Sequence, residues 1–306
     1  MRQRLRHRIG LYSLVLTAAL WASDDASCQG SESYFAADGY AIPYDLETPT
    51  SRSWLPKRLD EISGLTVLDS TRIAAVEDED GVVYVLDASS FDVISEHRFG
   101  GGGDYEGIER VGDDLYVLRS DGMLFHLRDW DHDEVREVRR LDTPLSGRHD
   151  TEGLAVEPGE RSLLIACKEY PGKGFKGKRT AYRFDIEVGE LEDVPALVFD
   201  AEAAEKDQSE GIVSRAVRRL LDVRRFKPSG LAVHPISSEI YVVSSVSRSL
   251  AVFDQDGTLL GVTKLDKDLL HQPEGIAFLP DGDLLLSSES NGKRGRLVRF
   301  EYEPRP

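Results

Sequence analysis

Short runs of alternating apolar and polar residues dominate the chain from about residue 60 onward. DLYVLRSDG at 114–122 and EIYVVSSVSRSLAVFD at 239–254 are examples, and both are rich in Tyr, Val, Leu and Phe. A period of two with β-branched and aromatic residues predicts strands. Turn-forming pairs such as Asp-Gly and Pro-Gly separate the runs, and helix-period apolar patterns are absent from them. The pattern therefore predicts an all-β fold.

The runs belong to an internal repeat of three strands, which occurs five times. Each copy contains a shared glycine near its start. The residue before that glycine is Ser63, Glu106, Glu152, Ser229 or Glu274, and these residues are separated by 43, 46, 77 and 45 positions. Three of these spacings match one blade of a β-propeller. The spacing predicts a five-bladed β-propeller, with a six-bladed ring as the alternative.

The long spacing of 77 residues contains a segment with a different period. In EKDQSEGIVSRAVRRLLDVRRFK at 205–227, Ile212, Ala216 and Leu220 recur every four residues. This is the apolar stripe of an amphipathic helix, so a helical insertion over about 201–226 is predicted between blades three and four. Its basic part, 209–225, is expected to be a solvated face, or alternatively a docking site for an acidic partner or a membrane surface.

Ring closure requires that the first and last blades be joined. The last repeat offers only three strands before the chain ends. We therefore expect the segment after Tyr40, YAIPYDLETP, to supply the outer strand of that blade.

The first residues have the layout of a secretory signal: arginines, then an apolar run over 11–22, then small residues. Residues 1–26 are predicted to be a signal peptide, with an uncleaved anchor as the alternative. Cys28 is a candidate for lipidation, in which case the signal extends to residue 27. Residues 27–39 are predicted to be a linker and 40–306 a single propeller domain, located in the periplasm or cell envelope.

The formal net charge of −17 argues against nucleic acid as a partner. Cys167, within LLIACKE, is expected to pack in the core. With Cys28 and Cys167 as its two cysteines, the mature protein is expected to have no disulfide framework.

The glycine motifs resemble those of the SdiA-regulated domain family. They are SGL at 63–65, EGI at 106–108, EGL at 152–154, SGLAVHP at 229–235 and QPEGIAF at 272–278. Members of this family are extracytoplasmic bacterial propellers, distantly similar to NHL-repeat proteins. The resemblance implies five blades and a bound calcium ion, and it implies no established activity.

The residue before each glycine is expected to face the central channel, because the first strand of every blade lines that channel. Glu106, Glu152 and Glu274 would then repel one another unless a cation lay between them. Oxygen ligands of this kind suit calcium, so these three are predicted metal ligands. Ser63 and Ser229 would complete the ring as hydrogen-bonding residues. The alternative is that the acids cap turns or strand starts.

A second tier of candidates lies at the ends of the second strands. These channel-lining candidates are Glu77, Arg119, Lys168, Glu169 and Glu289. Arg119 and Lys168 have the chemistry to receive an anionic ligand beside a metal. Alternatively, Lys168 and Glu169 form an ion pair with each other.

Three functions are compatible with these features. The first is an extracytoplasmic calcium-binding module that presents its channel mouth to a small-molecule or protein ligand. The second is a calcium-dependent hydrolase of a lactone, ester or phosphoester, in which a channel acid such as Glu152 acts as base. The third is a scaffold whose channel holds only solvent.

Overall fold

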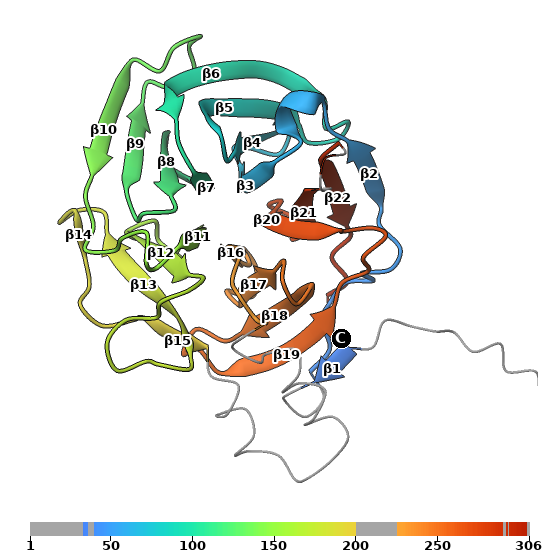
Figure 1. The fold of residues 1–306 in the computed structure, drawn as a ribbon. Helices are drawn as coiled ribbons and strands as arrows, with labels where there is room; N and C mark the ends of the chain where they lie inside the picture. Colours follow the sequence, from blue (N-terminus) through green and yellow to red (C-terminus); the bar gives the residue numbers. More distant parts are fainter. Residues whose placement is uncertain (1–32, 36–39, 200–224, 290–291, 293, 305–306) are drawn as a thin grey trace, which may run out of the picture. The chain divides into compact units, whose positions relative to one another are not determined.

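The computed structural model describes residues 33–35, 40–199, 225–289, 292 and 294–304. These residues form five antiparallel sheets (Figure 1). Blade one contains β3 (Ile62–Val67), β4 (Arg72–Glu77), β5 (Asp80–Asp87) and β6 (Val93–Gly102). Blade two contains β7 (Tyr105–Val111), β8 (Asp114–Arg119), β9 (Leu124–Arg128) and β10 (Glu137–Leu141).

The other three blades follow the same order from the axis outward, with additions at their outer edges. Blade three contains β11 (Thr151–Val156), β12 (Ser162–Cys167), β13 (Arg179–Asp185), β14 (Glu190–Leu191) and β15 (Leu197–Phe199). Blade four contains β16 (Gly230–Val233), β17 (Ile240–Ser244), β18 (Ser249–Phe253), β19 (Leu259–Lys264) and β1 (Ser33–Phe35). Blade five contains β20 (Gln272–Phe278), β21 (Leu284–Glu289), β22 (Arg296–Phe300) and β2 (Ser51–Trp54).

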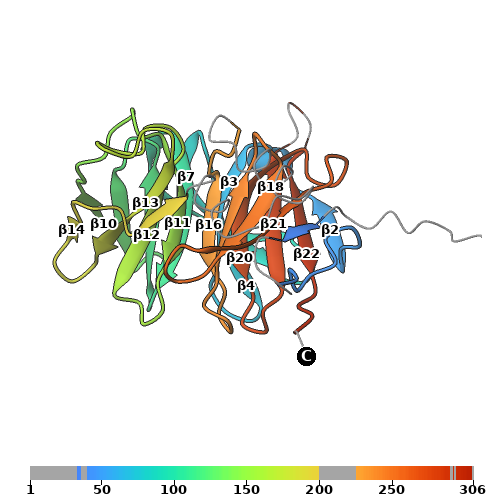
Figure 2. The ribbon, with the colours of Figure 1, turned by 90° about the horizontal axis from the view of Figure 1, so that it is seen from below.

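The first strands of the blades surround a common axis, as predicted. In Figure 1, β3, β7, β11, β16 and β20 lie nearest the centre, and each contacts the first strands of its two neighbours. Figure 2 shows the same blades from the side, with their strands running along the axis. The five-bladed prediction is confirmed for the described residues, and the six-bladed alternative is wrong. Blade three ends at Phe199 and blade four begins at Gly230.

The last blade is closed by the N-terminal part of the chain, although by a later segment than predicted. β2 pairs with β22 in antiparallel register, from Ser51 opposite Arg299 to Trp54 opposite Arg296. The Arg296 guanidinium lies 3.9 Å from the centre of the Trp54 ring, a cation–π contact that strengthens the junction. The expected segment after Tyr40 does not form this strand.

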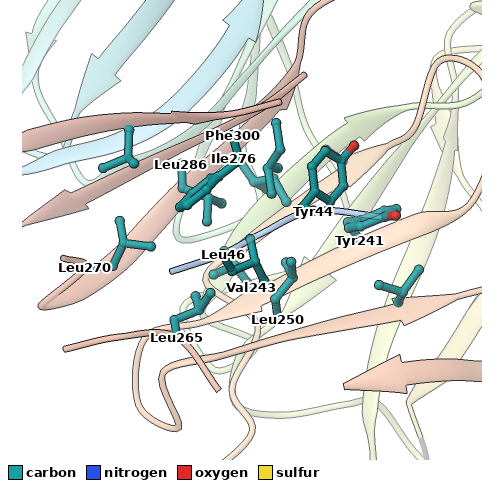
Figure 3. Packing of buried hydrophobic residues seen from close by; sticks show 14 of the residues in the cluster. Tyr44, Leu46, Tyr241, Val243, Leu250, Leu265, Leu270, Ile276, Leu286 and Phe300 are labelled. Carbon is teal, nitrogen blue, oxygen red and sulfur yellow. The ribbon is translucent and has the colours of Figure 1, made fainter. Parts of the chain in front are cut away.

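Residues 40–46 instead pack between blades four and five. Tyr44 and Leu46 belong to a buried cluster with residues of both blades, including Tyr241 and Phe300 (Figure 3). The Tyr44 hydroxyl donates a hydrogen bond to the Gly282 carbonyl at 2.7 Å, which satisfies its polar end. Apolar side chains at Tyr40, Tyr44 and Leu46 explain this placement, because burial stabilises them more than an exposed outer strand would.

Several sequence predictions lie outside the described residues. They are the signal peptide at 1–26, Cys28, and the helical insertion apart from its last two residues, 225–226. No α-helix occurs among the residues that the structure describes, and 57–59 form a short 3-10 helix. Within the same part of the chain, no helix has the length and apolarity needed to cross a membrane. In the predicted linker 27–39, residues 33–35 form β1, which pairs with β19.

Cys167 lies at the end of β12 and is fully buried, as expected for a core residue. Burial raises the pKa of its thiol to about 12. A thiol held protonated in this way is a poor nucleophile.

Candidate functional site

In four of the five blades, the residue before the shared glycine lies at an irregularity of the sheet. The register between the first and second strands shifts between Ile62 and Gly64 and between Tyr105 and Gly107. The same shift occurs in blade three around Glu152 and in blade five around Glu274. A β-bulge leaves the extra residue without a ladder partner and turns its side chain to a new direction. This geometry explains why an acid can stand inside an otherwise apolar strand.

The glycine that follows permits the first strands to approach one another at the axis. A Cβ atom on Gly230 would lie 2.2 Å from the Glu274 carbonyl oxygen of the next blade. One on Gly107 would lie 2.8 Å from the Leu154 Cβ atom. Since real Cβ atoms do not approach so closely, only glycine fits at these positions.

The inner ends of these strands enclose a very small axial cavity. Ser63, Glu106 and Glu152 are among the residues that line it, and its volume is about 10 Å³. That volume accommodates about one water molecule or ion. At this depth the channel therefore excludes an organic ligand, which would have to bind at the mouth.

The three channel glutamates are difficult to ionise together. Burial, followed by the charges of Glu152, Asp104 and Glu274, raises the pKa of Glu106 to about 10. Burial likewise raises the pKa of Glu152 to about 8, against the opposing effect of Lys168. Burial and the charge of Glu152 hold the pKa of Glu274 well above its usual range. The ordinary pKa of a glutamate is 4.5, so these raised values mean that the environment strongly disfavours three negative charges.

Lys168, the residue after β12, is the one cation that meets this group in the described structure. Its Nζ atom donates a hydrogen bond to Glu152 Oε1, and only 6% of the Glu152 side chain is exposed. Burial lowers the pKa of Lys168, but the negative charge of Glu152 and its hydrogen bond outweigh that effect, so the pKa is raised overall. The second oxygen of Glu152, Oε2, is buried and has no hydrogen-bond partner among the described residues.

The two serines of the ring join neighbouring blades. Ser63 Oγ donates to the Tyr105 carbonyl at 2.6 Å, and Ser229 Oγ donates to the Pro273 carbonyl at 2.8 Å. Each acceptor is the residue just before a channel glutamate. These hydroxyls therefore hold the backbone that positions Glu106 and Glu274.

The other second-strand candidates have local partners. The Glu77 carboxylate accepts hydrogen bonds from the backbone N–H groups of Glu79 and Asp80. Arg119 donates two hydrogen bonds to Asp121, at 2.7 and 3.0 Å, so its guanidinium is bound there and not to the channel glutamates. Glu289 accepts from Gln272 Nε2 at 2.6 Å.

The alternative ion pair between Lys168 and Glu169 is wrong. Glu169 binds Lys227 instead, while Lys168 turns to Glu152. The two adjacent side chains therefore point to different partners, as successive residues near a strand end commonly do.

Further acids lie around the channel: Asp78, which follows Glu77 among the predicted second-strand candidates, and Asp104 and Asp150, which sequence reasoning missed. Burial and the charges of Glu61 and Glu77 raise the pKa of Asp78 to about 7. Burial raises the pKa of Asp150, and the charge of Asp104 contributes to the raised pKa of both Glu106 and Glu152. A signal for two of them was present, since Asp-x-Glu-Gly occurs at 104–107 and again at 150–153.

The oxygen donors of this group are of the kind that binds hard divalent cations. All the acids provide oxygen, and Glu152 Oε2 lacks a partner where an ion would supply one. As the side chains stand, however, no three His, Cys, Asp or Glu residues in the described part of the chain are grouped closely enough to hold a metal. Lys168 occupies one oxygen that such an ion would need.

Fold and site together define a five-bladed β-propeller with a ring of buried acids in its channel. The chain belongs to the SdiA-regulated family, whose model matches residues 49–292. No curated protein shows significant similarity to the chain.

Solved structures with a similar fold have very different sequences. A luciferin-regenerating enzyme has a TM-score of 0.50 and 11% identity, over 83% of this chain and 95% of its own. The PQQ-bound aldose sugar dehydrogenase from Streptomyces coelicolor has a TM-score of 0.49 and 12% identity, over 83% and 99%. A gluconolactonase from Xanthomonas campestris has a TM-score of 0.45 and 14% identity, over 75% and 69%. At such identities the likeness concerns the fold alone.

Proposed function

We propose that the protein is a cation-binding propeller module that holds one divalent cation, calcium, in its channel and presents the channel mouth to a ligand or partner. The observation that carries this proposal is the electrostatic coupling of Glu106, Glu152 and Glu274 at the axis, where Glu106 and Glu152 line a space of about 10 Å³. A divalent cation would remove the electrostatic cost of ionising these acids together.

Lys168 would be the built-in competitor for this site. Its ammonium group offsets one negative charge of the ring and contacts Glu152 Oε1. Once Lys168 has left, three ionised glutamates carry a charge of −3, of which a divalent ion would offset two. Binding would require Lys168 to leave Glu152, and its side chain, which is 24% exposed, is long enough to turn toward solvent.

Acids outside the ring favour a cationic group at the mouth. Asp78 and Glu289 both have pKa values raised to about 7, chiefly by burial and then by neighbouring acids. Since Arg119 is bound to Asp121, the anionic ligand expected from the sequence has little support there. We place the protein in the periplasm or cell envelope on the strength of its predicted signal peptide.

Calcium titration by calorimetry, with elemental analysis of the purified protein, tests the proposal. We expect about one calcium per chain and weaker binding in Glu152→Gln, because that change removes a charged ligand. Lys168→Met should bind calcium more tightly, because its competing charge is absent. Glu192→Gln, at an exposed ion pair of blade three, is the matched control. If Glu152→Gln and Lys168→Met both bind like the unchanged protein, the ion is not held by this ring.

A calcium-dependent hydrolase is the second candidate function. The axial cavity is too small for substrate beside the acids, so a reaction would have to occur at the mouth. Calcium-dependent turnover of a lactone, ester and phosphoester panel, lost in Glu152→Gln, would establish that activity.

A further inference from the structure

A second cavity lies at the rim of the propeller, away from the channel acids. Its volume is about 470 Å³, within the range of small-molecule sites. The turn between β17 and β18 contributes Arg248, and the end of β19 with the following loop contributes Lys264, Leu265 and Lys267. Leu46, from the segment that packs between blades four and five, completes the apolar side.

Three cations surround this cavity in a protein with an excess of acids. The chain has 55 Asp and Glu residues against 38 Lys and Arg. Many described arginines are paired, for example Arg183 with Glu157 and Arg299 with Asp283. Arg248, Lys264 and Lys267, by contrast, form no ion pair with any residue that the structure describes.

The cavity wall also contains two acids, Glu47 and Asp266, and neither forms an ion pair with the three cations among the described residues. Asp266 accepts a hydrogen bond from the Asp268 backbone N–H at 2.8 Å, and this bond stabilises the loop. Its charge also acts on Arg296. Glu47 is exposed on the opposite segment. The wall therefore keeps an excess positive charge.

Arg248 is the residue that most clearly faces a missing partner. Its Nε atom is buried and makes no hydrogen bond within the described residues. Leaving a charged donor buried and unsatisfied costs free energy that a bound anion would recover. Its φ angle is 48°, in the left-handed region where glycine is favoured, so an arginine here costs about 1 kcal/mol relative to glycine.

Two buried leucines lie beneath the cations. Leu46 and Leu265 are 4% and 1% exposed and belong to the cluster shown in Figure 3, where both are labelled. Because these two leucines are almost fully buried, they form the floor of the cavity, and a ligand would contact mainly the charged side chains.

We propose that this cavity binds a small organic anion, with a carboxylate or phosphate group at Arg248, Lys264 and Lys267. The arginine fork and two flexible lysines match the oxygen atoms of such groups. This site is independent of the cation site in the channel.

Calorimetry with three probes tests the chemistry: phenyl phosphate, benzoate and phenol. We expect phenyl phosphate, benzoate or both to bind, with affinity that falls as salt increases, and phenol to bind far more weakly. Comparing the two anions shows which headgroup the site prefers. If neither anion binds at about 10 mM, or if phenol binds as well as they do, the proposal is wrong.

Arg248→Gly is the decisive variant, because it removes the guanidinium while giving the left-handed position its preferred residue. It should fold at least as stably as the parent protein and bind the anion about tenfold more weakly. Arg139→Gln, on the exposed strand β10, should bind normally. Glu152→Gln should also bind the anion normally, which separates this site from the channel. Unchanged anion affinity in Arg248→Gly would overturn the proposal.

Discussion

Gly230→Ala provides the sharpest test of why a glycine follows each channel residue. The added Cβ atom would lie 2.2 Å from the Glu274 carbonyl oxygen, 2.9 Å from Val243 Cγ1 and 3.0 Å from Ile276 Cγ2. The first obstacle is backbone of the neighbouring blade, so no side-chain rotation relieves the clash. Overpacking of this kind costs about 3 kcal/mol, at the upper end of the usual range because β16 and β20 would have to separate.

For a domain of this size, that loss corresponds to a fall in Tm of about 6 °C or more. The assay is thermal unfolding followed by circular dichroism or calorimetry. Gly147→Ala is the matched control, because its Cβ atom would have no neighbour within 4 Å and its φ is not positive. A Gly230→Ala protein that melts within about 1 °C of the parent would refute the close-approach explanation.

Two further predictions concern the channel. The first concerns pH, with chelator present to remove metal. The folded protein keeps protons on Glu106 and Glu152 up to pKa values of about 10 and 8, whereas the unfolded chain releases them above about pH 4.5. The free energy of unfolding should therefore fall as the pH rises toward the folded pKa values. Thermal melts from pH 5 to 9 test this, and the fall of Tm with pH should be shallower in Glu106→Gln. A Tm that rises over this range contradicts the prediction. Ser63→Ala leaves the buried Tyr105 carbonyl without its 2.6 Å donor and should cost about 1–2 kcal/mol in urea unfolding, whereas the exposed Ser70→Ala should cost nothing measurable.

The ring could be predicted from the sequence because its steric demands recur in every blade. A glycine is required wherever two first strands meet, so Gly107 and Gly230 belong to a regular series that is visible without a structure. The alternation of apolar residues then identifies the strands. The blade count followed from these two signals.

The closing strand could not be predicted in the same way. Ser51–Trp54 has little apolar content, and its pairing with Arg296–Arg299 is decided by a distant part of the chain. The segment after Tyr40 has more apolar residues and was preferred for that reason, but those side chains pack into the core instead.

Within the site, the identity of the ring residues was predictable and their partners were not. Glu106, Glu152 and Glu274 occur at one repeated position. That Lys168 binds Glu152 rather than Glu169 depends on side-chain direction at the end of β12. The bulges that turn the acids toward the axis likewise leave no unambiguous mark in a single sequence.

The junction of β2 with β22 has a kinetic consequence. The hydrogen bond from the Glu301 N–H to Thr50 Oγ1 joins residues 251 positions apart. Such a contact cannot form until nearly the whole domain has been synthesised and the five blades have assembled. Until then β22 presents an unpaired edge to other molecules, a state open to aggregation. Conditions that speed this last step should therefore raise the yield of soluble protein more than conditions that stabilise individual blades.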